Sequence, residues 1–532
     1  MQLCIDMKLP INYSYASIKR FTIYALVFIA VADFALVLIQ AKPFGVDEWR
    51  LIYNIKFKDP VALWSQLDFV QQFPRAYLEL IKIFSAPFDY SYFTLRLPSF
   101  IVGTTIIFFC YRLMNKIYYP LQRTHYLFIL ILIASQAFLE HFIEVKQYTM
   151  DILLSLVAIW QLIELLSLHG SYANKGRYAL LCLTFFITPF FSYTYPIAVA
   201  PVYIIIAMQS INQIIIVRSF AYTKAYLFQK WLPLIIGVVG ITIFYFTDVS
   251  QVMADKGMHQ YWASQMMTHG FDIKILLSNC FLLFAQVGSG VVFQAIFGIV
   301  GVSAFIVGIV QIFKYFDYSR LAFLKLYSVL LIACALGLFI AGKLPLGVSR
   351  LNAFTIASIA FLITNMVYTL LRSFQFRKIA IVLFTVLFVG LIGNILNSYA
   401  IGFVKNEYTK KLNIYVNTEN AIILAQKKQI PILITPHVAF PDDKVLNFPG
   451  NYTLATNMCF PPGYNQSVHC ISGDNIPGDW VLKTFPAYKP NQHLTVYAVN
   501  SLDQLDECMQ QIPASIKTFL VGDGISFKII NR

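Results

Sequence analysis

The feature that most constrains this chain is a series of apolar runs, each long enough to cross a lipid bilayer. A bilayer core of about 30 Å is spanned by a helix of roughly 20 apolar residues. Such runs recur up to about residue 400, and the sequence is 58% hydrophobic with only 12% charged residues, about half the charged fraction usual in soluble domains. Because helices satisfy their own backbone hydrogen bonds in lipid, the pattern predicts an all-α polytopic membrane domain.

Eleven membrane-spanning helices are expected. The first follows Lys19 and Arg20 and resembles a signal sequence. It is long and has no small-x-small cleavage site, so we interpret it as a retained anchor. The shortest expected spans are the third and the fifth. The spans are 21–41, 97–115, 125–139, 149–168, 178–192, 195–217, 231–247, 288–313, 321–341, 351–371 and 379–400.

Basic residues are distributed unequally between the two sets of loops. In the short loops between the spans, Lys and Arg are concentrated in alternate loops, which the positive-inside rule assigns to the cytoplasm. The N-terminus is therefore expected inside, and an odd number of spans exports the C-terminus. This placement accounts for the net charge of +14 without nucleic acid, which is not an expected partner. The inner loops hold Arg112, Lys116, Arg123, Lys175, Arg177, Arg218, Lys224, Lys230, Lys314, Arg320, Lys325, Arg372, Arg377 and Lys378.

Two loops on the expected outer face are long. Residues 42–96 are rich in aromatic side chains. The stretches 61–70 and 76–84 within them are amphipathic, which is typical of helices lying in the membrane interface. The second loop, residues 248–287, is also expected not to span the membrane. It carries His259, Tyr261, Trp262 and His269.

The tail, residues 401–532, is far more polar than the rest. Stretches 418–429 and 501–512 predict helices, and 430–440 and 517–523 predict strands. We therefore expect a small extracytoplasmic α/β domain after a transmembrane domain at 1–400. Cys459 and Cys470 could form a disulfide if the tail is exported, but their spacing leaves this open.

Charged residues gather at the expected outer ends of several spans. "PFGVDEWRLIY" (43–53) follows the first span, "EHFIEVKQY" (140–148) separates the third from the fourth, and "GKLPLGVSRLN" (342–352) separates the ninth from the tenth. All three lie at the same expected depth, so one cavity could gather them. The residues concerned are Asp47, Glu48, Arg50, Glu144, Lys146, Tyr148, Lys343 and Arg350.

Carboxylates facing cations at a membrane surface suit transfer of a sugar from a lipid phosphate. Departure of the sugar develops negative charge on the phosphate, which Arg and Lys stabilise by charge-assisted hydrogen bonds. A carboxylate can accept the proton that the acceptor loses. Arginine matches phosphate geometry better than lysine, which favours Arg50 and Arg350 as donor ligands.

Each of these residues also has a simpler interpretation. An Asp-Glu pair after a helix is more often a solvated loop than a catalytic pair. Glu144 and Lys146 could belong to a surface turn, and Arg350 could extend to the lipid headgroups. The histidines of the 248–287 loop are more often interfacial than metal ligands. Asp33, inside the first span, is either a functional charge or the partner of a neighbouring helix.

Four short motifs share their order, spacing and sidedness with one group of membrane enzymes. They are "DEWRLIY", "LRLPSFIVGT" at the start of the second span, "FIEVKQYTMDILLSLVA" and "LPLGVSR". Together they resemble the GT-C superfamily of polyprenyl-phosphate-sugar glycosyltransferases. The resemblance is to its protein O-mannosyltransferase-like branch, which includes the bacterial lipid A aminoarabinose transferases, and it covers residues 1–400.

The resemblance implies a role for each motif residue. Asp47 would be the catalytic base or the acid that orients the acceptor, with Glu48 beside it. Lipid phosphate would be held by Arg50, Arg350 and Lys146, the last standing where the family has arginine. Glu144 and Tyr148 would shape the sugar site. One departure concerns "QQFPRAY" (71–77), which lacks the charged residue that many members have before Pro-Pro. Arg75 is a candidate replacement.

The expected function is therefore transfer of a sugar from a polyprenyl-phosphate donor to a protein, lipid A or envelope glycan. A divalent metal is possible, and the expected location is a bacterial inner membrane. A transporter or lipid flippase is the alternative, although no internal repeat supports it. A non-catalytic envelope scaffold is a second alternative, in which the acidic pair would be replaceable without consequence.

Overall fold

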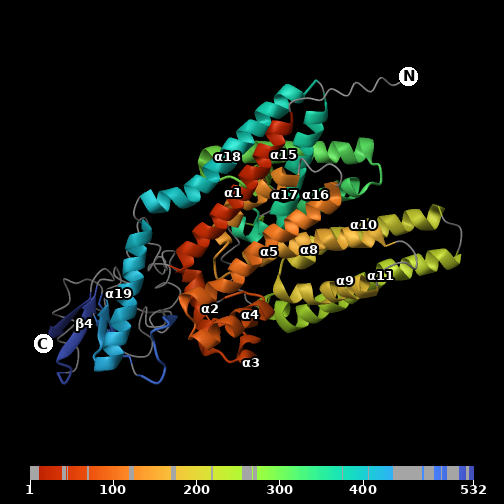
Figure 1. The fold of residues 1–532 in the computed structure, drawn as a ribbon. Helices are drawn as coiled ribbons and strands as arrows, with labels where there is room; N and C mark the ends of the chain where they lie inside the picture. The colour runs from red at the N-terminus through yellow and green to blue at the C-terminus, as the bar shows by residue number, and fades with distance from the viewer. Residues whose placement is uncertain are drawn as a thin grey trace.

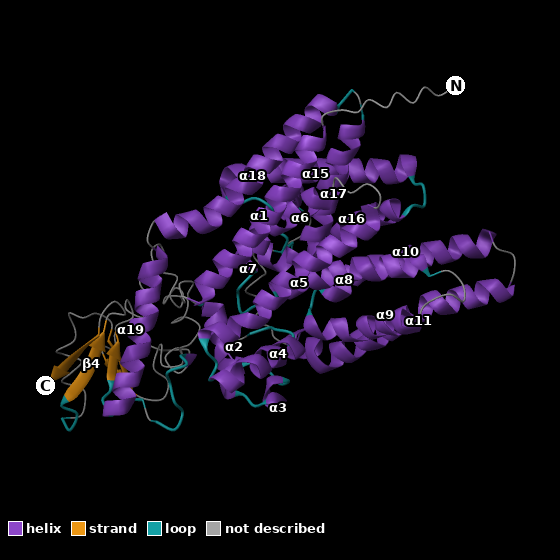
Figure 2. Ribbon diagram, in the orientation of Figure 1, coloured by secondary structure: helices purple, strands orange, loops and turns teal. Residues whose placement is uncertain are grey.

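The computed structural model shows a bundle of long helices with a small mixed α/β domain at one end (Figure 1). Figure 2 shows that strands are confined to that domain. The structure describes residues 11–38, 44, 46–68, 71–118, 125–168, 175–216, 220–253, 266–267, 272–373, 375–404, 407–434, 470–472, 484–492, 494–499, 514–522 and 527–531.

Eight of the described helices are long and apolar enough to cross a membrane, which confirms the expected multi-pass helical class. Most contain the apolar runs, and local caps set some of their ends. Ser319, for example, accepts a hydrogen bond from the Ala322 N–H at 3.1 Å. The helices are α5 (Tyr92–Tyr118), α8 (Tyr148–Ser167), α10 (Tyr195–Ile216), α11 (Phe220–Phe244), α15 (Gly290–Tyr315), α16 (Arg320–Ile340), α17 (Ile356–Arg372) and α18 (Arg377–Val404).

The predicted count of eleven is not confirmed. The first predicted span lies in α1 (Ile11–Leu38), which is not among those eight. The predicted span 125–139 is broken into α6 (His125–Ile133) and α7 (Gln136–His141). The span 178–192 is α9 (Lys175–Ile187) followed by a 3₁₀ turn, η4 (Thr188–Phe191), that contains Pro189. Proline lacks an N–H and ends the regular helix there.

Side chains hydrogen-bond the backbone groups that the break between α6 and α7 leaves without helical partners. Ser135 caps α7 by accepting from the Phe138 N–H at 3.3 Å. The amide of Asn394 in α18 donates to the carbonyls of Ala134 at 3.0 Å and Val287 at 2.7 Å. Val287 lies in the turn between α14 (Ile273–Ala285) and α15. A break inside an apolar bundle is tolerated because these carbonyls are hydrogen-bonded.

The first long loop is largely helical. It forms α2 (Val46–Phe57), α3 (Pro60–Leu63), α4 (Arg75–Ser85) and η2 (Ala86–Phe88). The prediction of a helix at 76–84 is confirmed by α4. The helix predicted at 61–70 is not continuous over residues 64–68, where Asn54 of α2 binds the loop; residues 69–70 lie outside the described residues. The side chain of Asn54 accepts from the Asp68 N–H at 2.8 Å and donates to the Asp68 carbonyl at 3.2 Å.

The loop expected at 248–287 is also partly helical. α11 continues through a π-helical turn, η5 (Tyr245–Val249), into α12 (Ser250–Met253). α14 is apolar and packs along α15. The side chains singled out from the sequence lie outside the described residues; they are His259, Tyr261, Trp262 and His269.

The tail contains a helix and a five-stranded mixed sheet, as the predicted α/β domain requires. α19 (Glu407–Lys428) contains the predicted helix, and β1 (Ile432–Ile434) and β4 (Thr518–Gly522) lie in the predicted strands. The order is β2 (Cys470–Ser472), β3 (Val496–Val499), β1, β4, β5 (Phe527–Asn531). β1 is parallel to β3 and β4, and both outer pairings are antiparallel. The predicted helix 501–512, Cys459 and the Cys470 side chain lie outside the described residues.

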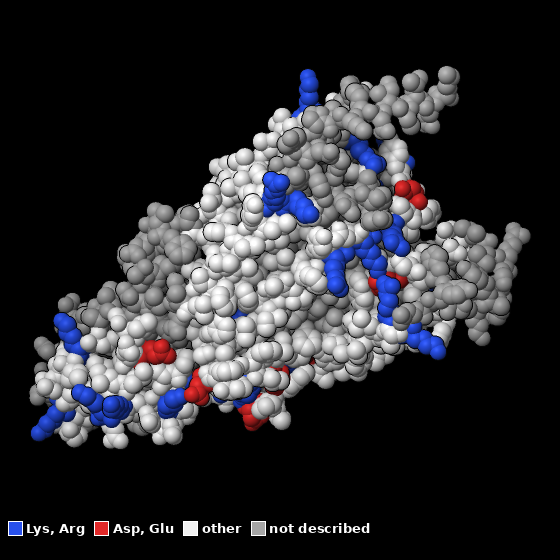
Figure 3. Space-filling model, in the orientation of Figure 1, with Lys and Arg blue, Asp and Glu red and all other residues white. Residues whose placement is uncertain are grey.

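Charged side chains are concentrated toward the two ends of the bundle. On the face drawn in Figure 3, an almost uncharged band separates Lys and Arg at one end from charged groups at the other. The second end carries α2, α3 and α4, with the tail domain beside them (Figure 1). We call it the α2 end. The candidate residues from the sequence lie there.

Candidate functional site

Asp47 is the centre of the charged residues at the α2 end. It lies in the first turn of α2, where a carboxylate is favoured by the helix dipole. Its Oδ2 accepts a hydrogen bond from Nη1 of Arg350 at 3.2 Å, across 303 residues of sequence. Nη1 of Arg50, one turn along α2, lies 4.0 Å from Oδ1. The side chains of Asp47 and Arg350 remain 39% and 34% exposed, so both face solvent.

Lys146 brings the third sequence segment to Asp47. The lysine is buried, and its Nζ lies 3.4 Å from Oε1 of Gln71. The charge of Lys146 is the main reason that the pKa of Asp47 lies below its ordinary value; Arg350 and Arg50 act in the same direction. Burial lowers the pKa of Lys146, although Asp47 opposes that shift. One half-exposed carboxylate therefore faces three cations.

Glu48 has a different position from its neighbour. It is 5% exposed, and its Oε1 accepts from the Val145 N–H at 2.7 Å. Nη2 of Arg96 lies 3.6 Å from the same oxygen, and Nη1 of Arg96 donates to the Ile143 carbonyl at 2.6 Å. Glu48 and Arg96 thus hold the turn before α8 against α2. The predicted catalytic role of Glu48 remains a prediction, but its carboxylate is engaged by the protein.

Glu144 is paired with His141, at the end of α7. Nδ1 of His141 lies 2.6 Å from Oε2 of Glu144. The imidazole packs at 4.6 Å from the ring of Tyr148, the first residue of α8. The charges of Arg350, Glu144 and Asp47 all act on the Tyr148 hydroxyl. This group therefore adjoins the Asp47 centre.

Asn352 shapes the turn that presents Arg350. Its amide donates to the carbonyls of Pro345, Leu346 and Val348, at 2.8, 3.2 and 3.0 Å. Arg350 then enters η6 (Ser349–Thr355), which packs against α7 and α8. Lys343, in the same loop, is exposed, and no described contact joins its side chain to Asp47. Its predicted role in substrate binding therefore has no geometric support among the described residues.

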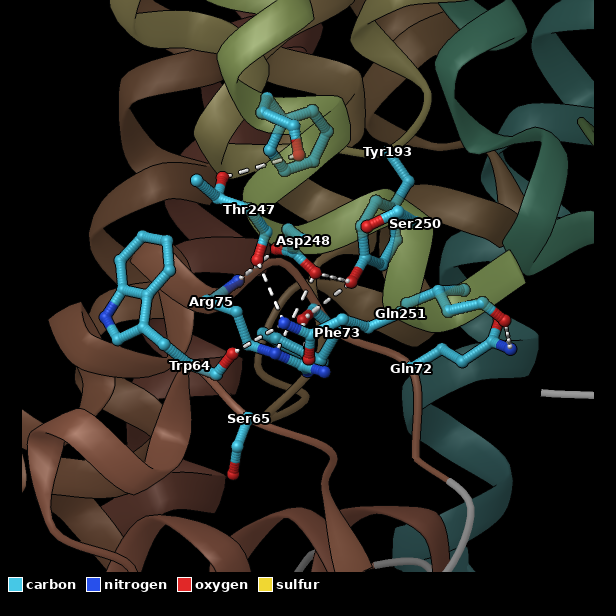
Figure 4. Close-up of polar contacts among 12 residues, drawn as sticks. Trp64, Ser65, Gln72, Phe73, Arg75, Tyr193, Thr247, Asp248, Ser250 and Gln251 are labelled. Carbon is cyan, nitrogen blue, oxygen red and sulfur yellow. Dashed lines mark hydrogen bonds and ion pairs between the residues drawn. The ribbon is translucent and has the colours of Figure 1, made fainter. Parts of the chain in front are cut away.

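Arg75 lies in a separate buried cluster (Figure 4). Its backbone N–H donates to Oδ2 of Asp248 at 2.9 Å, and its Nε lies 3.8 Å from Oδ1. The hydroxyl of Tyr193 donates to Oδ1 of Asp248 at 2.6 Å. Nη1 of Arg75 donates to the Phe73 carbonyl at 2.9 Å. The cluster fixes α4 to η5, and the described contacts of Arg75 lie there and not at Asp47. Gln71, from the same loop, contacts Lys146.

The tail domain contacts α2 beside the site. The rings of Phe485 and Trp49 stack with centroids 4.9 Å apart, and both side chains are buried. Nζ of Lys56 donates to the Phe485 carbonyl at 2.9 Å. The amide of Gln426 in α19 donates to the Lys489 carbonyl at 3.0 Å. The segment 484–489 therefore connects α19 to the helix that carries Asp47.

Sequence reasoning found most of these residues but missed some of their supports. Arg96 stands inside a quoted motif, yet nothing in that motif shows that its guanidinium points inward. Asp33 is the partner of a neighbouring helix, one of the two interpretations given above, because its Oδ2 accepts a hydrogen bond from the Tyr399 hydroxyl of α18 at 2.7 Å. Among the described residues, no group of three or more His, Cys, Asp or Glu side chains is arranged to hold a metal ion.

No family model matches this chain, and no curated protein matches it.

Proposed function

We propose that this protein is an integral membrane glycosyltransferase. It transfers a sugar from a polyprenyl-phosphate donor to a protein, lipid A or envelope-glycan acceptor at the α2 end. One observation carries the proposal. Three distant segments bring Arg50, Lys146 and Arg350 around the half-exposed carboxylate of Asp47. A surplus of cations at a bundle end suits a lipid phosphate.

The reaction requires stabilisation of charge and removal of a proton. The bond between the sugar C1 and the phosphate oxygen breaks, and C1 forms a bond to the acceptor oxygen or nitrogen. The phosphate leaves with the bonding electrons, so its negative charge grows as the bond breaks. Arg50, Lys146 and Arg350 stabilise that charge. Asp47 orients the acceptor and keeps the three cations together before the donor binds.

The charge distribution supports an orientation. At the end opposite α2, basic residues stand where α5, α15 and α17 end and where α9, α16 and α18 begin. The positive-inside rule assigns that end to the cytoplasm. The α2 end and the tail domain would then face the periplasm of a bacterial inner membrane, where a lipid-linked donor and an envelope acceptor can meet.

A transporter or lipid flippase is less well supported. Such a protein needs polar groups along a path through the membrane. Asp33 accepts from Tyr399 at 2.7 Å, and Asp151 accepts from the Ser192 hydroxyl at 2.5 Å. These intramembrane carboxylates are bound to neighbouring segments, whereas the charges around Asp47 lie at the bundle end.

The test is Asp47→Asn in the full chain, compared with a deletion strain. We expect the deletion and Asp47→Asn to accumulate the same polyprenyl-phosphate sugar, detected by mass spectrometry of extracted lipids, and to lose the same envelope glycan. The matched control is Asp68→Asn. Asp68 is a half-exposed acid at the same end, 3.3 Å from Lys58, and its variant should behave like wild type. Normal glycans in Asp47→Asn, at wild-type protein levels, would refute the assignment.

A further inference from the structure

His141 is a buried titratable side chain to which the sequence assigned no role. It is 6% exposed, and its Nε2 has no hydrogen-bond partner among the described residues. Burial of a polar nitrogen without a partner is unfavourable. The other ring nitrogen faces Glu144 at 2.6 Å. A carboxylate on Nδ1 favours the tautomer with the proton there, which leaves the Nε2 lone pair available to accept a proton.

Asp47 and Glu48 are poorly suited to accept a proton. Asp47 receives a hydrogen bond from Arg350 at 3.2 Å, and three cations hold its pKa below its ordinary value. A carboxylate in that state is a weak base, because an efficient base has a pKa near the working pH. Glu48 is buried and already accepts from the Val145 N–H. The acceptor's proton therefore needs another destination.

The position of His141 is close to the proposed reaction. Its ring lies 4.6 Å from the ring of Tyr148, whose hydroxyl is subject to the charges of Asp47 and Arg350. α7 packs against η6, which carries Arg350. A nucleophile held between the cation cluster and Tyr148 would therefore be near the imidazole, which the Glu144 carboxylate holds in orientation.

We propose that His141, oriented by Glu144, is the general base of the transferase. This inference rests on the proposed function and assigns its proton transfer. As the bond from the acceptor oxygen or nitrogen to C1 forms and the C1–phosphate bond breaks, the acceptor's proton passes to Nε2 of His141. The resulting imidazolium is stabilised by Glu144. Asp47 then serves to organise the cations and the acceptor, not to take the proton.

Several charged or titratable groups bear on the imidazole. α6 has Tyr126 at its far end, and Tyr399 of α18 is bonded to Asp33. The groups nearest along the elements that pack on His141 are Glu140 of α7, Glu144 and Lys146 of the following turn, Tyr148 and Asp151 of α8, and Arg350 of η6.

The experiment compares His141→Gln, Glu144→Gln and wild type as full chains in detergent. The donor probe is the polyprenyl-phosphate sugar fraction extracted from the deletion strain, and the acceptor is envelope material from that strain. We expect His141→Gln to lower kcat about 10²–10⁴-fold with little change in the KM of the donor. The acidic limb of its pH profile should disappear. Glu144→Gln should shift that limb and lower kcat less.

Three results would overturn the proposal. In the first, His141→Gln keeps kcat within threefold of wild type. In the second, it loses activity but keeps the wild-type pH profile, which indicates a structural role. In both, normal transfer by wild type leaves the proposed function standing. In the third, wild type transfers nothing and the deletion accumulates no lipid-linked sugar, so both proposals fail together.

Discussion

Two arginine–carboxylate pairs at the α2 end differ in nearly every respect. In Arg75–Asp248 the side chains are 2% and 0% exposed, and both carboxylate oxygens receive hydrogen bonds from the protein. In Arg350–Asp47 they are 34% and 39% exposed, joined by one hydrogen bond of 3.2 Å. The first pair joins a loop to a helix. The second brings together segments that have no other evident reason to present charge to solvent.

The difference separates structural charge from charge available to a ligand. A buried pair repays its desolvation only when its remaining polar atoms are satisfied. Both oxygens of Asp248 meet that condition, whereas Nε of Arg75 has no hydrogen-bond partner among the described residues. An exposed pair contributes little to stability, so a gain in folding stability does not explain the Asp47–Arg350 pair. Arg50, Lys146 and Arg350 repel one another, and a bound phosphate would relieve that repulsion.

The largest expected effect is the loss of Asp248. In Asp248→Ala, Arg75 and Tyr193 are left buried without their partner, which typically costs about 3–5 kcal/mol. We expect a large drop in the thermal midpoint of the detergent-solubilised full chain. Asp47→Ala should lower the thermal midpoint by less than Asp248→Ala does, because its hydrogen-bonded partner Arg350 is 34% exposed and can be solvated. The double variant Arg75→Met/Asp248→Leu, which removes both charges, should recover part of the loss. An equal drop in thermal midpoint for Asp248→Ala and Asp47→Ala would contradict the division into a structural pair and a pair available to a ligand.

The next effect is on activity alone. Arg350→Ala removes one charged donor from the centre, and loss of one such donor commonly lowers kcat about 10²–10³-fold. Arg350→Lys keeps the charge but not the planar guanidinium, so its activity should be intermediate. Both should retain the thermal midpoint of wild type. If Arg350→Ala unfolds as readily as Asp248→Ala, the Asp47 pair is structural as well.

The sequence predicted the exposed pair better than the buried one. Asp47, Lys146 and Arg350 were found because each follows or precedes an apolar run at the same expected depth. Helix ends that share a depth also share a surface. Arg75 and Asp248 are 173 residues apart, and neither lies in a pattern that specifies a partner. Burial of both is a property of packing, which a one-dimensional pattern does not contain.

The helix count was not confirmed, for a related reason. The run 125–139 is apolar except for His125, Ser135 and Gln136, and its mean hydropathy is that of one continuous span despite the break at Ser135. The break is stabilised by Asn394, which is distant in sequence and hydrogen-bonds the carbonyl of Ala134. Similarly, 61–70 was predicted to be helical from its own amphipathicity, but the helix ends at Leu63, and Asn54 binds Asp68 in the loop that follows. Local pattern determines propensity, and a tertiary hydrogen bond can override it.

A third charged contact has an intermediate degree of burial. Lys56 of α2 is half-buried, and its Nζ donates to the carbonyls of Phe485 and Tyr488 at 2.9 and 3.4 Å. Burial lowers the pKa of Lys56 to about 8; the charge of Lys489 acts in the same direction and Asp89 opposes it. Docking of the tail on α2 should therefore depend on pH, unlike either arginine pair.

The sign of this smallest effect follows from proton counting. Between about pH 8 and the ordinary lysine pKa of 10.4, the unfolded or undocked state binds more protons at Lys56 than the docked state, so docking strengthens as pH rises. Near pH 8 about half of the maximal slope applies, or ~0.7 kcal/mol per pH unit.

Limited proteolysis of the tail at pH 7.5 and 8.5 should show greater protection at the higher pH. Lys56→Met should abolish the difference, and Lys58→Met, on the same helix end, should retain it. Equal pH dependence in Lys56→Met and wild type would show that another group titrates at this contact.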